Sequence, residues 1–413
     1  MTTGDSPSRE RMPLAGVRVL DLSRILAGPF CTQLLADLGA DVVKVERPGT
    51  GDDTREWGPP FVANDADGKR GPSGYFLSCN RGKRSLVLDL AKPESRAVLD
   101  DLLRTADAMI ENFLPDTVAK LGLEPERLKQ LNPRLVTCSI SGYGRTGPLA
   151  DMPGYDLAIQ ASSGLMSITG EPDGEPMKVG VAISDILTGL YAATSLLAGL
   201  FAREQGRTAS GFDLALADCT LAALVNVAQS SLLTGRSPRR FGNAHPQIVP
   251  YESFPTADGH VVLAVGADRQ WERFCLAVGQ VEWSSDPRFR TNPDRVAHRD
   301  ELSGLLRPLM QSRTTADWLQ LLESAEVPHA RIATVDEAAA TPQSQFREMV
   351  QTLEDEAGRP LSLLGSPIHW SDRTAPKPTP PPDLGRHTDA ILRDWLHYED
   401  EHLARLREAG VIA

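Results

Sequence analysis

Residues 17–46, VRVLDLSRILAGPFCTQLLADLGADVVKVE, decide the fold. Val17–Leu22 has the nearly continuous apolar composition of a buried strand, and Val42–Glu46 repeats it. Between them, residues 29–38 have helical spacing and end at Gly39, a residue typical of helix C-termini. A strand, a helix and a strand in this order predict a βαβ unit with parallel strands and a right-handed crossover.

The same alternation continues through the first third of the chain. Further strands are predicted at Ser85–Asp89, Ala108–Glu111 and Leu135–Ile140, and helices at Pro93–Arg104 and Pro125–Leu131. No G-x-G-x-x-G or P-loop sequence follows the first strand, so the fingerprints of dinucleotide and nucleoside triphosphate sites are missing. We therefore expect a Rossmann-like α/β sheet whose ligand is bound in another way.

The second half of the chain predicts a change of architecture. Two long helices are expected at Asp185–Arg203 and Asp218–Leu233, followed by a β-hairpin at residues 251–265 with its turn at Asp258–Gly259. We expect a loose tail at residues 1–12, a large domain at 13–234, a smaller domain at 235–330 and a return to the large domain at 331–413. The proline-rich run Ala375–Pro382 is then an extended connector that precedes a helix at Asp389–Leu396.

Composition excludes several classes of protein. The net charge of −12 disfavours nucleic acid as a partner. Five scattered cysteines without a CxxC pair predict a reduced, cytoplasmic protein and no metal site. The apolar stretch Ile186–Ala202 is shorter than the ~20 residues of a membrane span, so we interpret it as a core helix and expect no membrane partner.

Five short segments carry residue types that suit binding or catalysis, and each also has a structural interpretation as a turn, a charged loop or a helix cap. Glycine lets the backbone approach a ligand closely, and arginine and lysine pair with phosphates. The segments are Arg24–Pro29 (RILAGP), Glu46–Arg55 (ERPGTGDDTR), Asn80–Arg84 (NRGKR), Gly154–Asp156 (GYD) with the small residues 161–164, and Val181–Gly189 (VAISDILTG).

Asp185 lies at the start of the most apolar helix, and local rules favour a helix cap. Two effects act on its carboxyl pKa in opposite directions, because apolar surroundings raise it and a helix N-terminus lowers it. If the helix terminus keeps it ionised, the poorly hydrated carboxylate is a nucleophile toward an activated acyl group. Both interpretations, cap and nucleophile, remain open at this point.

Taken in order, these segments resemble the class III coenzyme A-transferases, the family of formyl-CoA and carnitine-CoA transferases. The resemblance covers nearly the whole chain. It is carried by VLDLSRILAGPF, GADVVKVERPGTGD, NRGKRSLVLDL, ADAMIENFLP, NPRLVTCSISGYGRTGP, GYDLAIQASSG, GVAISDILTG, YESFPTADGHVVLAVG and GRHTDAILRDWL.

The resemblance implies a large Rossmann-like domain built from both ends of the chain, a smaller α+β domain between them, and an interlocked, ring-like homodimer. It also implies that Asp185 is the nucleophile. Its carboxylate would attack the donor thioester to give a mixed anhydride and CoA thiolate, and the thiolate would then form an aspartyl-CoA thioester. Coenzyme A or acyl-CoA would be a substrate, and no cofactor would be bound permanently.

The same resemblance assigns a CoA site by residue. Arg24, Ile25, Leu26 and Ala27 would lie along the pantetheine and nucleotide, and Arg47 would meet the adenosine or phosphate end. Leu88, Asn112 and Phe113 would bracket the adenine, and Tyr143 would lie near the thioester. Lys120 would contact phosphates, and Lys83 or Lys92 would add a further phosphate contact.

Two departures narrow the expected reaction. The loop at residues 241–254 lacks the glycine run of some members, which disfavours formyl and oxalyl substrates and leaves His245 and Gln247 as candidate acyl contacts. Racemases of this superfamily carry a histidine where this chain has Tyr155, so a two-base racemase would lack one base. Tyr155 remains a candidate substrate contact.

The loops are most similar to the branch that moves CoA from succinyl-CoA to glutarate or a related dicarboxylate. The alternatives are an α-methylacyl-CoA racemase and a CoA-binding protein without activity.

Overall fold

The computed structural model describes residues 12–63, 70–208, 211–355 and 358–413. Its central element is a six-stranded sheet in the order β3-β2-β1-β4-β5-β6, parallel at every pairing. This is the strand order of the Rossmann fold, which confirms the predicted α/β class. The strands are β1 (Arg18–Asp21), β2 (Asp41–Glu46), β3 (Lys83–Val87), β4 (Ala108–Glu111), β5 (Val136–Ser141) and β6 (Gly211–Ala215).

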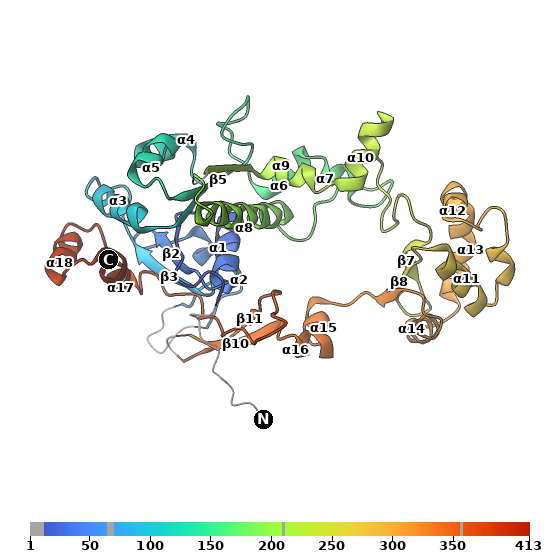
Figure 1. The fold of residues 1–413 in the computed structure, drawn as a ribbon. Helices are drawn as coiled ribbons and strands as arrows, with labels where there is room; N and C mark the ends of the chain where they lie inside the picture. The colour runs from blue at the N-terminus through green and yellow to red at the C-terminus, as the bar shows by residue number, and fades with distance from the viewer. Residues whose placement is uncertain (1–11, 64–69, 209–210, 356–357) are drawn as a thin grey trace. The chain divides into compact units, whose positions relative to one another are not determined.

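Both faces of the sheet are covered, so the central strands β1, β2 and β4 are buried at nearly every residue. Successive residues of a strand point to opposite faces, so Val19 and Leu20 belong to two different buried clusters. The cluster of Val19 includes side chains of α1 (Ala27–Asp37) and α8 (Ile183–Glu204). The cluster of Leu20 includes those of α3 (Ser95–Thr105) and α17 (Thr388–Leu396) (Figure 1).

The C-terminal segment belongs to the sheet built by the N-terminal segment. Thr388 at the start of α17 accepts a hydrogen bond from the backbone N–H of Val87 at 3.1 Å, and Trp395 is 2% exposed in the cluster that covers β3. Figure 1 shows α17 and α18 (Asp400–Glu408) in red beside α3 and β3. The large part of the fold is therefore built from both ends of the chain.

The remaining helices of this part are short, and one strand pair lies outside the main sheet. The helices are η2 (Asp53–Glu56), α2 (Gly74–Ser78), α4 (Pro115–Leu121), α5 (Pro125–Leu131), α6 (Asp156–Ser162), α9 (Leu216–Ala222) and α16 (Pro342–Phe346); the pair is the antiparallel hairpin β10 (Val350–Glu354) and β11 (Pro360–Leu364). The short helix α7 (Leu165–Ile168) begins in this part, at Leu165, and continues into the smaller unit.

A smaller α+β unit contains a three-stranded antiparallel sheet in the order β7-β8-β9. Its core is one cluster that includes the fully buried Trp271 and Trp318. The elements are β7 (Tyr251–Pro255), β8 (His260–Ala264), β9 (His329–Arg331), α11 (Asp268–Ala277), η3 (Val281–Ser284), α12 (Asn292–Ala297), α13 (Arg299–Gln311), α14 (Thr315–Ser324) and α15 (Val335–Ala339).

The chain divides into a larger unit of residues 1–165, 179–229 and 343–413, and a smaller unit of residues 166–178 and 230–342. The predicted borders of the smaller domain were 235 and 330, and the segment 166–178 was placed in the larger one. Of the predicted loose tail, residues 1–11 lie outside the described residues. Met12 does not fit that description, because it is 7% exposed and its side chain lies close to Gly39, which has a φ of 103°.

The predicted helix at Asp218–Leu233 is wrong as a single element. It is two helices, α9 and α10 (Val225–Thr234), which meet at an angle of 79°. Val225 has a φ of 31° at the break, and no glycine or proline marks the position.

The helix α8 has 22 residues and is apolar enough, by length and composition, to cross a membrane, as is the bent pair α9–α10. Leu196 is nevertheless 0% exposed in the cluster that α8 forms with α1 and the sheet. We therefore interpret α8 as the core helix that its sequence predicts, although it is longer than the apolar stretch.

Candidate active site

The carboxyl ends of β1, β2, β3 and β4 meet at one edge of the sheet, where α/β folds bind their ligands. A cavity of about 410 Å³ opens there. The cavity is lined by Leu22, Arg24, Lys44, Val45, Glu46, Arg47, Gly51, Asp52, Leu88, Asp89, Leu90, Ala91, Phe113, Thr117, Lys120 and Leu121. Within the described ranges, no group of three or more His, Cys, Asp or Glu side chains could hold a metal ion.

The loop after β1 is held in a strained conformation. Ile25 has a φ of 72°, which is costly for a β-branched residue. Its backbone N–H donates to the Asp52 carboxylate at 3.3 Å, and Asn112 accepts from the N–H of Arg24 at 2.9 Å and donates to its carbonyl at 2.8 Å. These contacts fix Arg24 at the cavity before any ligand binds. They also occupy both ends of the Asn112 amide, which acts here on the loop.

A buried ion pair stabilises the loop after β1. Lys44 and Asp52, both with side chains 0% exposed, lie 2.8 Å apart. Burial alone would raise the pKa of Asp52, but the Lys44 ammonium outweighs it and lowers the pKa to about 2. Burial would lower the pKa of Lys44, and the carboxylates of Asp52, Asp21 and Glu46 raise it instead. Asp52 is thus a permanent carboxylate that holds Ile25.

Lys83 does not fit the predicted phosphate contact. It is 1% exposed, and its Nζ donates to the carbonyl of Pro29 at 2.8 Å and to Asn80 Oδ1 at 2.9 Å, with the Asp21 carboxylate at 3.2 Å. An ammonium group with this set of partners, and without exposed surface, has a structural role. The burial of Lys83 could not be predicted, because the sequence Asn80–Arg84 is the same whether the lysine is exposed in a basic turn or buried.

Two half-exposed arginines meet one carboxylate at the mouth of the cavity. Asp53 accepts from Arg24 Nη1 at 3.1 Å and also pairs with Arg47 Nη2. The side chains of Arg24 and Arg47 are 43% and 47% exposed. Both guanidinium groups are therefore accessible to an anion, which would compete with Asp53 for them.

The predicted CoA residues divide into three groups by position. Five line the cavity directly: Arg24, Arg47, Leu88, Phe113 and Lys120. The neighbouring residues Ile25, Leu26 and Ala27 form the loop and the start of α1, whose N-cap is Leu26. Tyr143 follows β5 and packs, half-buried, against the cluster of α1 and α8. Their contact with a ligand stays a prediction.

Asp185 is the third residue of α8 rather than its cap, because the N-cap is Ala182. Asp156, in the GYD segment, takes the capping task from outside the helix: its Oδ1 accepts from the N–H of Ser184 at 2.8 Å. Gln160 Nε2 donates to the other oxygen of Asp156 at 2.7 Å. Among the described residues, the Asp185 carboxyl has no hydrogen bond or ion pair.

The balance of effects on the Asp185 pKa differs from the expectation that the helix terminus keeps the group ionised. Burial raises the pKa, and the negative charge of Asp156 adds to it, so that the pKa is about 7. The carboxyl group is therefore about half protonated at neutral pH. A carboxylate of this kind is more basic and less solvated than usual, which suits a nucleophile.

Tyr75, on α2, was not singled out in the sequence. Burial raises its pKa to about 12, and the charge of Asp185 is the next cause, followed by those of Cys79 and Asp156. The Tyr75 hydroxyl is thus a protonated donor in the electrostatic range of Asp185 at neutral pH. Its segment, GYFLSCN, has no pattern that separates it from an ordinary helix.

The N-termini of α1 and α8 are in close contact, which brings the RILAGP and VAISDILTG segments together. A Cβ atom at Gly189 would lie 2.7 Å from the carbonyl oxygen of Ala27. Only glycine allows this approach. The residues of two separate sequence motifs therefore form one site in the larger unit.

Of the three predicted substrate contacts, Tyr155 directly precedes Asp156, which caps α8, and the other two belong to the smaller unit. Tyr155 is the N-cap residue of α6 and is 70% exposed. His245 and Gln247 belong to the smaller unit, where Gln247 donates to Ser230 Oγ at 3.0 Å and its N–H donates to His245 Nδ1 at 3.0 Å. Burial lowers the pKa of His245, and the charge of Arg299 adds to that effect. Their contact with an acyl group remains a prediction.

The fold and this site define an α/β enzyme with a ligand cavity at the edge of a Rossmann-like sheet. Residues 14–388 match the family model described as CoA-transferase family III. The succinate–glutarate CoA-transferase of Agrobacterium fabrum is 46% identical over 94% of this chain and 97% of its own. Human succinyl-CoA:glutarate CoA-transferase is 38% identical over 97% of this chain and 90% of its own.

A solved structure is also similar to this chain in both fold and sequence. The CAIB/BAIF family protein from Brucella suis has a TM-score of 0.81 and 43% identity, and the match covers 93% of this chain and 99% of that one. The chain belongs to CoA-transferase family III and is an enzyme that transfers CoA.

Proposed function

We propose that this enzyme moves CoA from succinyl-CoA to glutarate or a related dicarboxylate, with Asp185 as the covalent nucleophile. The observation that carries the role of Asp185 is its free, weakly acidic carboxyl group at the N-terminus of α8, where Asp156 has taken over the capping bond. The names of the relatives support the choice of acids.

The proposed reaction has four steps. The Asp185 carboxylate attacks the thioester carbonyl of the donor, the C–S bond breaks, and CoA leaves as a thiolate. The thiolate attacks the aspartyl carbonyl of the anhydride, which releases the donor acid and leaves an aspartyl-CoA thioester. The acceptor carboxylate attacks this thioester and releases the thiolate again. Attack of the thiolate on the acceptor carbonyl forms the new acyl-CoA and restores Asp185.

We infer that CoA binds in the cavity at the edge of the sheet. Arg24, Arg47 and Lys120 supply positive charge for its phosphates, while Leu88 and Phe113 supply an apolar surface for the adenine. In this assignment Asn112 acts by holding Arg24 and does not contact the adenine. CoA is a substrate here, and no permanent cofactor is required by the chemistry.

The decisive experiment traps the covalent intermediate. Wild-type protein incubated with succinyl-CoA and hydroxylamine should acquire a hydroxamate on the peptide that contains Asp185, detected by mass spectrometry. Asp185→Asn should lose both the adduct and exchange while still binding CoA. Asp372→Asn is the matched control, because this exposed carboxylate pairs with the adjacent Arg373. Exchange by Asp185→Asn, or solvent deuterium at the α-carbon without exchange, would contradict the proposal.

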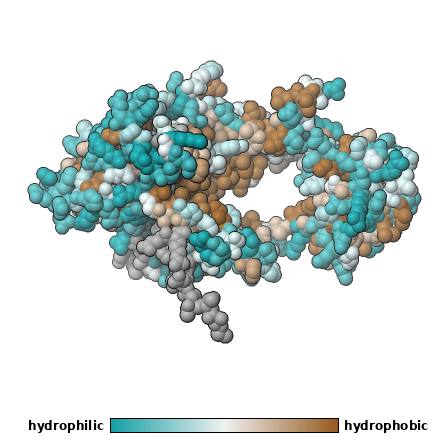
Figure 2. Space-filling model, viewed as in Figure 1, coloured by the Kyte–Doolittle hydropathy of each residue, from teal (hydrophilic) through white to brown (hydrophobic). Residues whose placement is uncertain are grey.

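A homodimer is part of the proposed functional state. The helix α10 leaves Val225, Leu232 and Leu233 exposed at 66%, 79% and 78%, and none of its residues is buried. Figure 2 shows this apolar surface over α10. Such a surface suits a second copy of the chain. Light scattering should give twice the chain mass of 44.8 kDa; a monomeric, active enzyme would overturn the dimer.

A reduced compartment such as the cytoplasm fits the thiol groups. All five cysteines are free and buried. Burial raises the pKa of Cys31, Cys79, Cys138, Cys219 and Cys275, which keeps them as unreactive thiols.

A further inference from the structure

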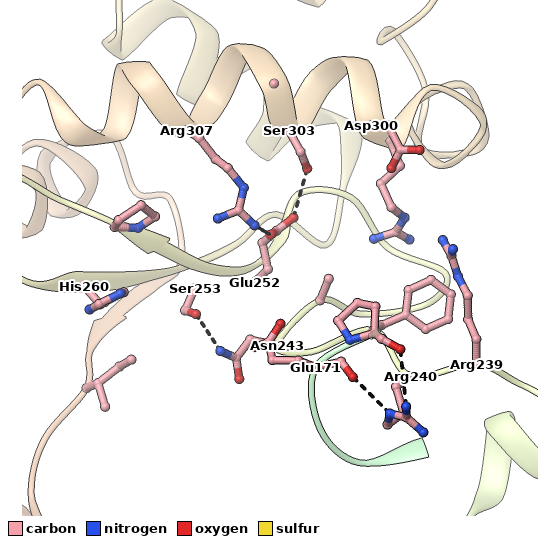
Figure 3. A pocket seen from close by; sticks show the side chains of 17 residues that line it. Glu171, Arg239, Arg240, Asn243, Glu252, Ser253, His260, Asp300, Ser303 and Arg307 are labelled. Atoms are coloured by element: carbon pink, nitrogen blue, oxygen red, sulfur yellow. Dashed lines mark hydrogen bonds and ion pairs between the residues drawn. The ribbon is translucent and has the colours of Figure 1, made fainter. Parts of the chain in front are cut away.

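The smaller unit contains a cavity of about 760 Å³ that no sequence motif predicted. It lies between the loop before β7, the strand β7 and the helix α13, and all its lining residues belong to the smaller unit (Figure 3). Four arginines line it in a chain with a net charge of −12. This concentration of positive charge points to an anionic ligand.

Two of these arginines face the cavity without a carboxylate partner. The guanidinium carbons of Arg239 and Arg299 lie 4.7 Å and 5.3 Å from the centre of the Phe241 ring. Neither forms an ion pair with any residue that the structure describes, although Arg299 Nη2 donates to the carbonyl of His245 at 2.8 Å. Burial lowers the pKa of Arg299; the Glu252 carboxylate opposes this, and the charge of Arg239 adds to it. An anion between two like charges would stabilise both.

The other two arginines are already engaged. Arg240 donates to the backbone carbonyls of Glu171 at 3.0 Å and of Gly174, which holds the segment 166–178 to this unit. Arg307 lies 3.3 Å from the carboxylate of Glu252, which is 6% exposed (Figure 3). Among the described residues, Arg239, Arg240 and Arg299 have no carboxylate partner. Arg240 is held to the backbone through both Nε and Nη2, whereas Arg299 is held through Nη2 alone, to the carbonyls of His245 and Pro246. Arg239 and the other guanidinium nitrogens of Arg299 are therefore the groups that remain for an anion.

The rest of the lining limits the class of ligand. Phe241, Pro255 and Ile332 supply apolar surface, which inorganic phosphate cannot use. Glu171, Glu252 and Asp300 add negative charge to the lining of the same cavity. These carboxylates repel a compact dianion more than a carboxylate on an organic chain. Planar guanidinium groups bind a carboxylate through paired hydrogen bonds.

We propose that this cavity binds a free organic acid, whose carboxylate pairs with Arg239 and Arg299 and whose carbon chain lies against the apolar lining. The smaller unit then carries its own acid site in addition to the site of Asp185. The site does not depend on covalent chemistry, so it can be tested without turnover.

The experiment measures glutarate binding to the full chain by isothermal titration calorimetry in the absence of CoA. Arg239→Gln should weaken binding about tenfold or more, which corresponds to about 1.4 kcal/mol. Arg236→Gln, an exposed arginine of the same segment outside the lining, is the matched control and should bind as the wild type does. Glutaramide, which lacks the charge, should not bind.

Two further arms separate this site from the proposed active site. Asp185→Asn should bind glutarate with unchanged affinity. Phe241→Leu, which leaves Arg239 and the charge of the cavity unaltered, should weaken glutarate binding through the loss of the aromatic surface. Equal affinity in Arg239→Gln and wild type would overturn the site, as would loss of binding in Asp185→Asn alone. Phosphate that binds as tightly as glutarate would overturn the organic-acid class. Failure of the Asp185 chemistry is detected separately by the hydroxamate adduct.

Discussion

At the residue scale, Asp156 and Asp185 have separate roles at the start of α8: one carboxylate caps the helix, and the other is the proposed nucleophile. Asp156 accepts the backbone N–H of Ser184 and so caps α8, while Asp185 keeps both oxygens free. The cost is electrostatic, because burial and the charge of Asp156 raise the pKa of Asp185 to about 7. A reactive group that is unfavourable for folding is common at active sites, where stability is given up for activity.

Asp185→Asn should stabilise the fold at alkaline pH. The pKa of Asp185 is higher in the folded chain than in the unfolded chain, so its stabilising contribution is present below pH about 4 and is lost as pH rises to about 7. Asparagine resembles the neutral carboxyl and carries no charge. The rise of the Asp185 pKa from 3.8 to about 7 corresponds to an expected gain on the order of 4 kcal/mol at pH 8 and none near pH 4, measured by urea unfolding. Equal stability at pH 8 would contradict the raised pKa.

The rate of exchange should depend on the same ionisation. Only the carboxylate attacks, so kcat/KM should fall about tenfold for each pH unit below about 7. Asp156→Asn removes the charge that helps to raise the Asp185 pKa, while its amide oxygen can still accept from Ser184. Its pH profile should therefore move to lower pH. A profile with an unchanged midpoint would show that Asp156 has no electrostatic effect on Asp185.

Asp53 should weaken the binding of CoA. Its carboxylate pairs with Arg24 and Arg47, both close to half exposed, at the mouth of the cavity. Asp53→Asn should lower the CoA dissociation constant two- to fivefold, since exposed ion pairs are worth about 0.5–1 kcal/mol. Glu56→Gln, which breaks the neighbouring exposed pair with Arg70, is the control and should leave affinity unchanged. Weaker binding in Asp53→Asn would mean that Asp53 positions the arginines.

At the scale of elements, the contact between α1 and α8 brings together the segments of the proposed active site. It depends on Gly189, where a Cβ atom would lie 2.7 Å from a backbone oxygen of α1. Backbone cannot move aside as a flexible side chain can, so the two helices would have to separate. The start of α8, and with it Asp185, would shift relative to the strained loop at Ile25.

Gly189→Ala should therefore reduce both stability and exchange. We expect a loss of about 1–3 kcal/mol in the free energy of unfolding and a fall in kcat. The matched control is Gly304→Ala in the helix α13, where the added Cβ has no atom within 4 Å. That change should stabilise the helix by about 0.5–1 kcal/mol. Similar stability changes in the two variants would mean that the α1–α8 contact is not tight.

Some helices and strands could be predicted from the sequence, and others could not. The strand β4 (Ala108–Glu111) and the helix α5 (Pro125–Leu131) have the predicted bounds, because alternation, composition and a proline in the first turn are local signals. The strand β6 (Gly211–Ala215) was missed because only one of its residues is buried, so it lacks an apolar pattern. The break between α9 and α10 was missed because Val225 has no intrinsic preference for a positive φ.

At the scale of the whole molecule, the two ends of the chain meet in one fold. The cluster that covers one face of the main sheet contains Leu20 from β1 and Trp395 from α17, which are separated by most of the chain. The smaller unit interrupts this fold and has its own core around Trp271 and Trp318. Each unit contains a cavity lined by several basic side chains, and we propose an acyl-CoA for the cavity of the larger unit and a free acid for that of the smaller unit.

The sequence by itself determined the α/β class, the family and the identity of the candidate nucleophile, because strand patterns and ordered motifs are readable in one dimension. Only the tertiary structure decided that Lys83 is buried, that Asp156 caps α8 and that the pKa of Asp185 is raised. It alone showed the arginine cavity of the smaller unit. These properties depend on burial and on charges brought close from distant positions, and neither can be derived from local sequence.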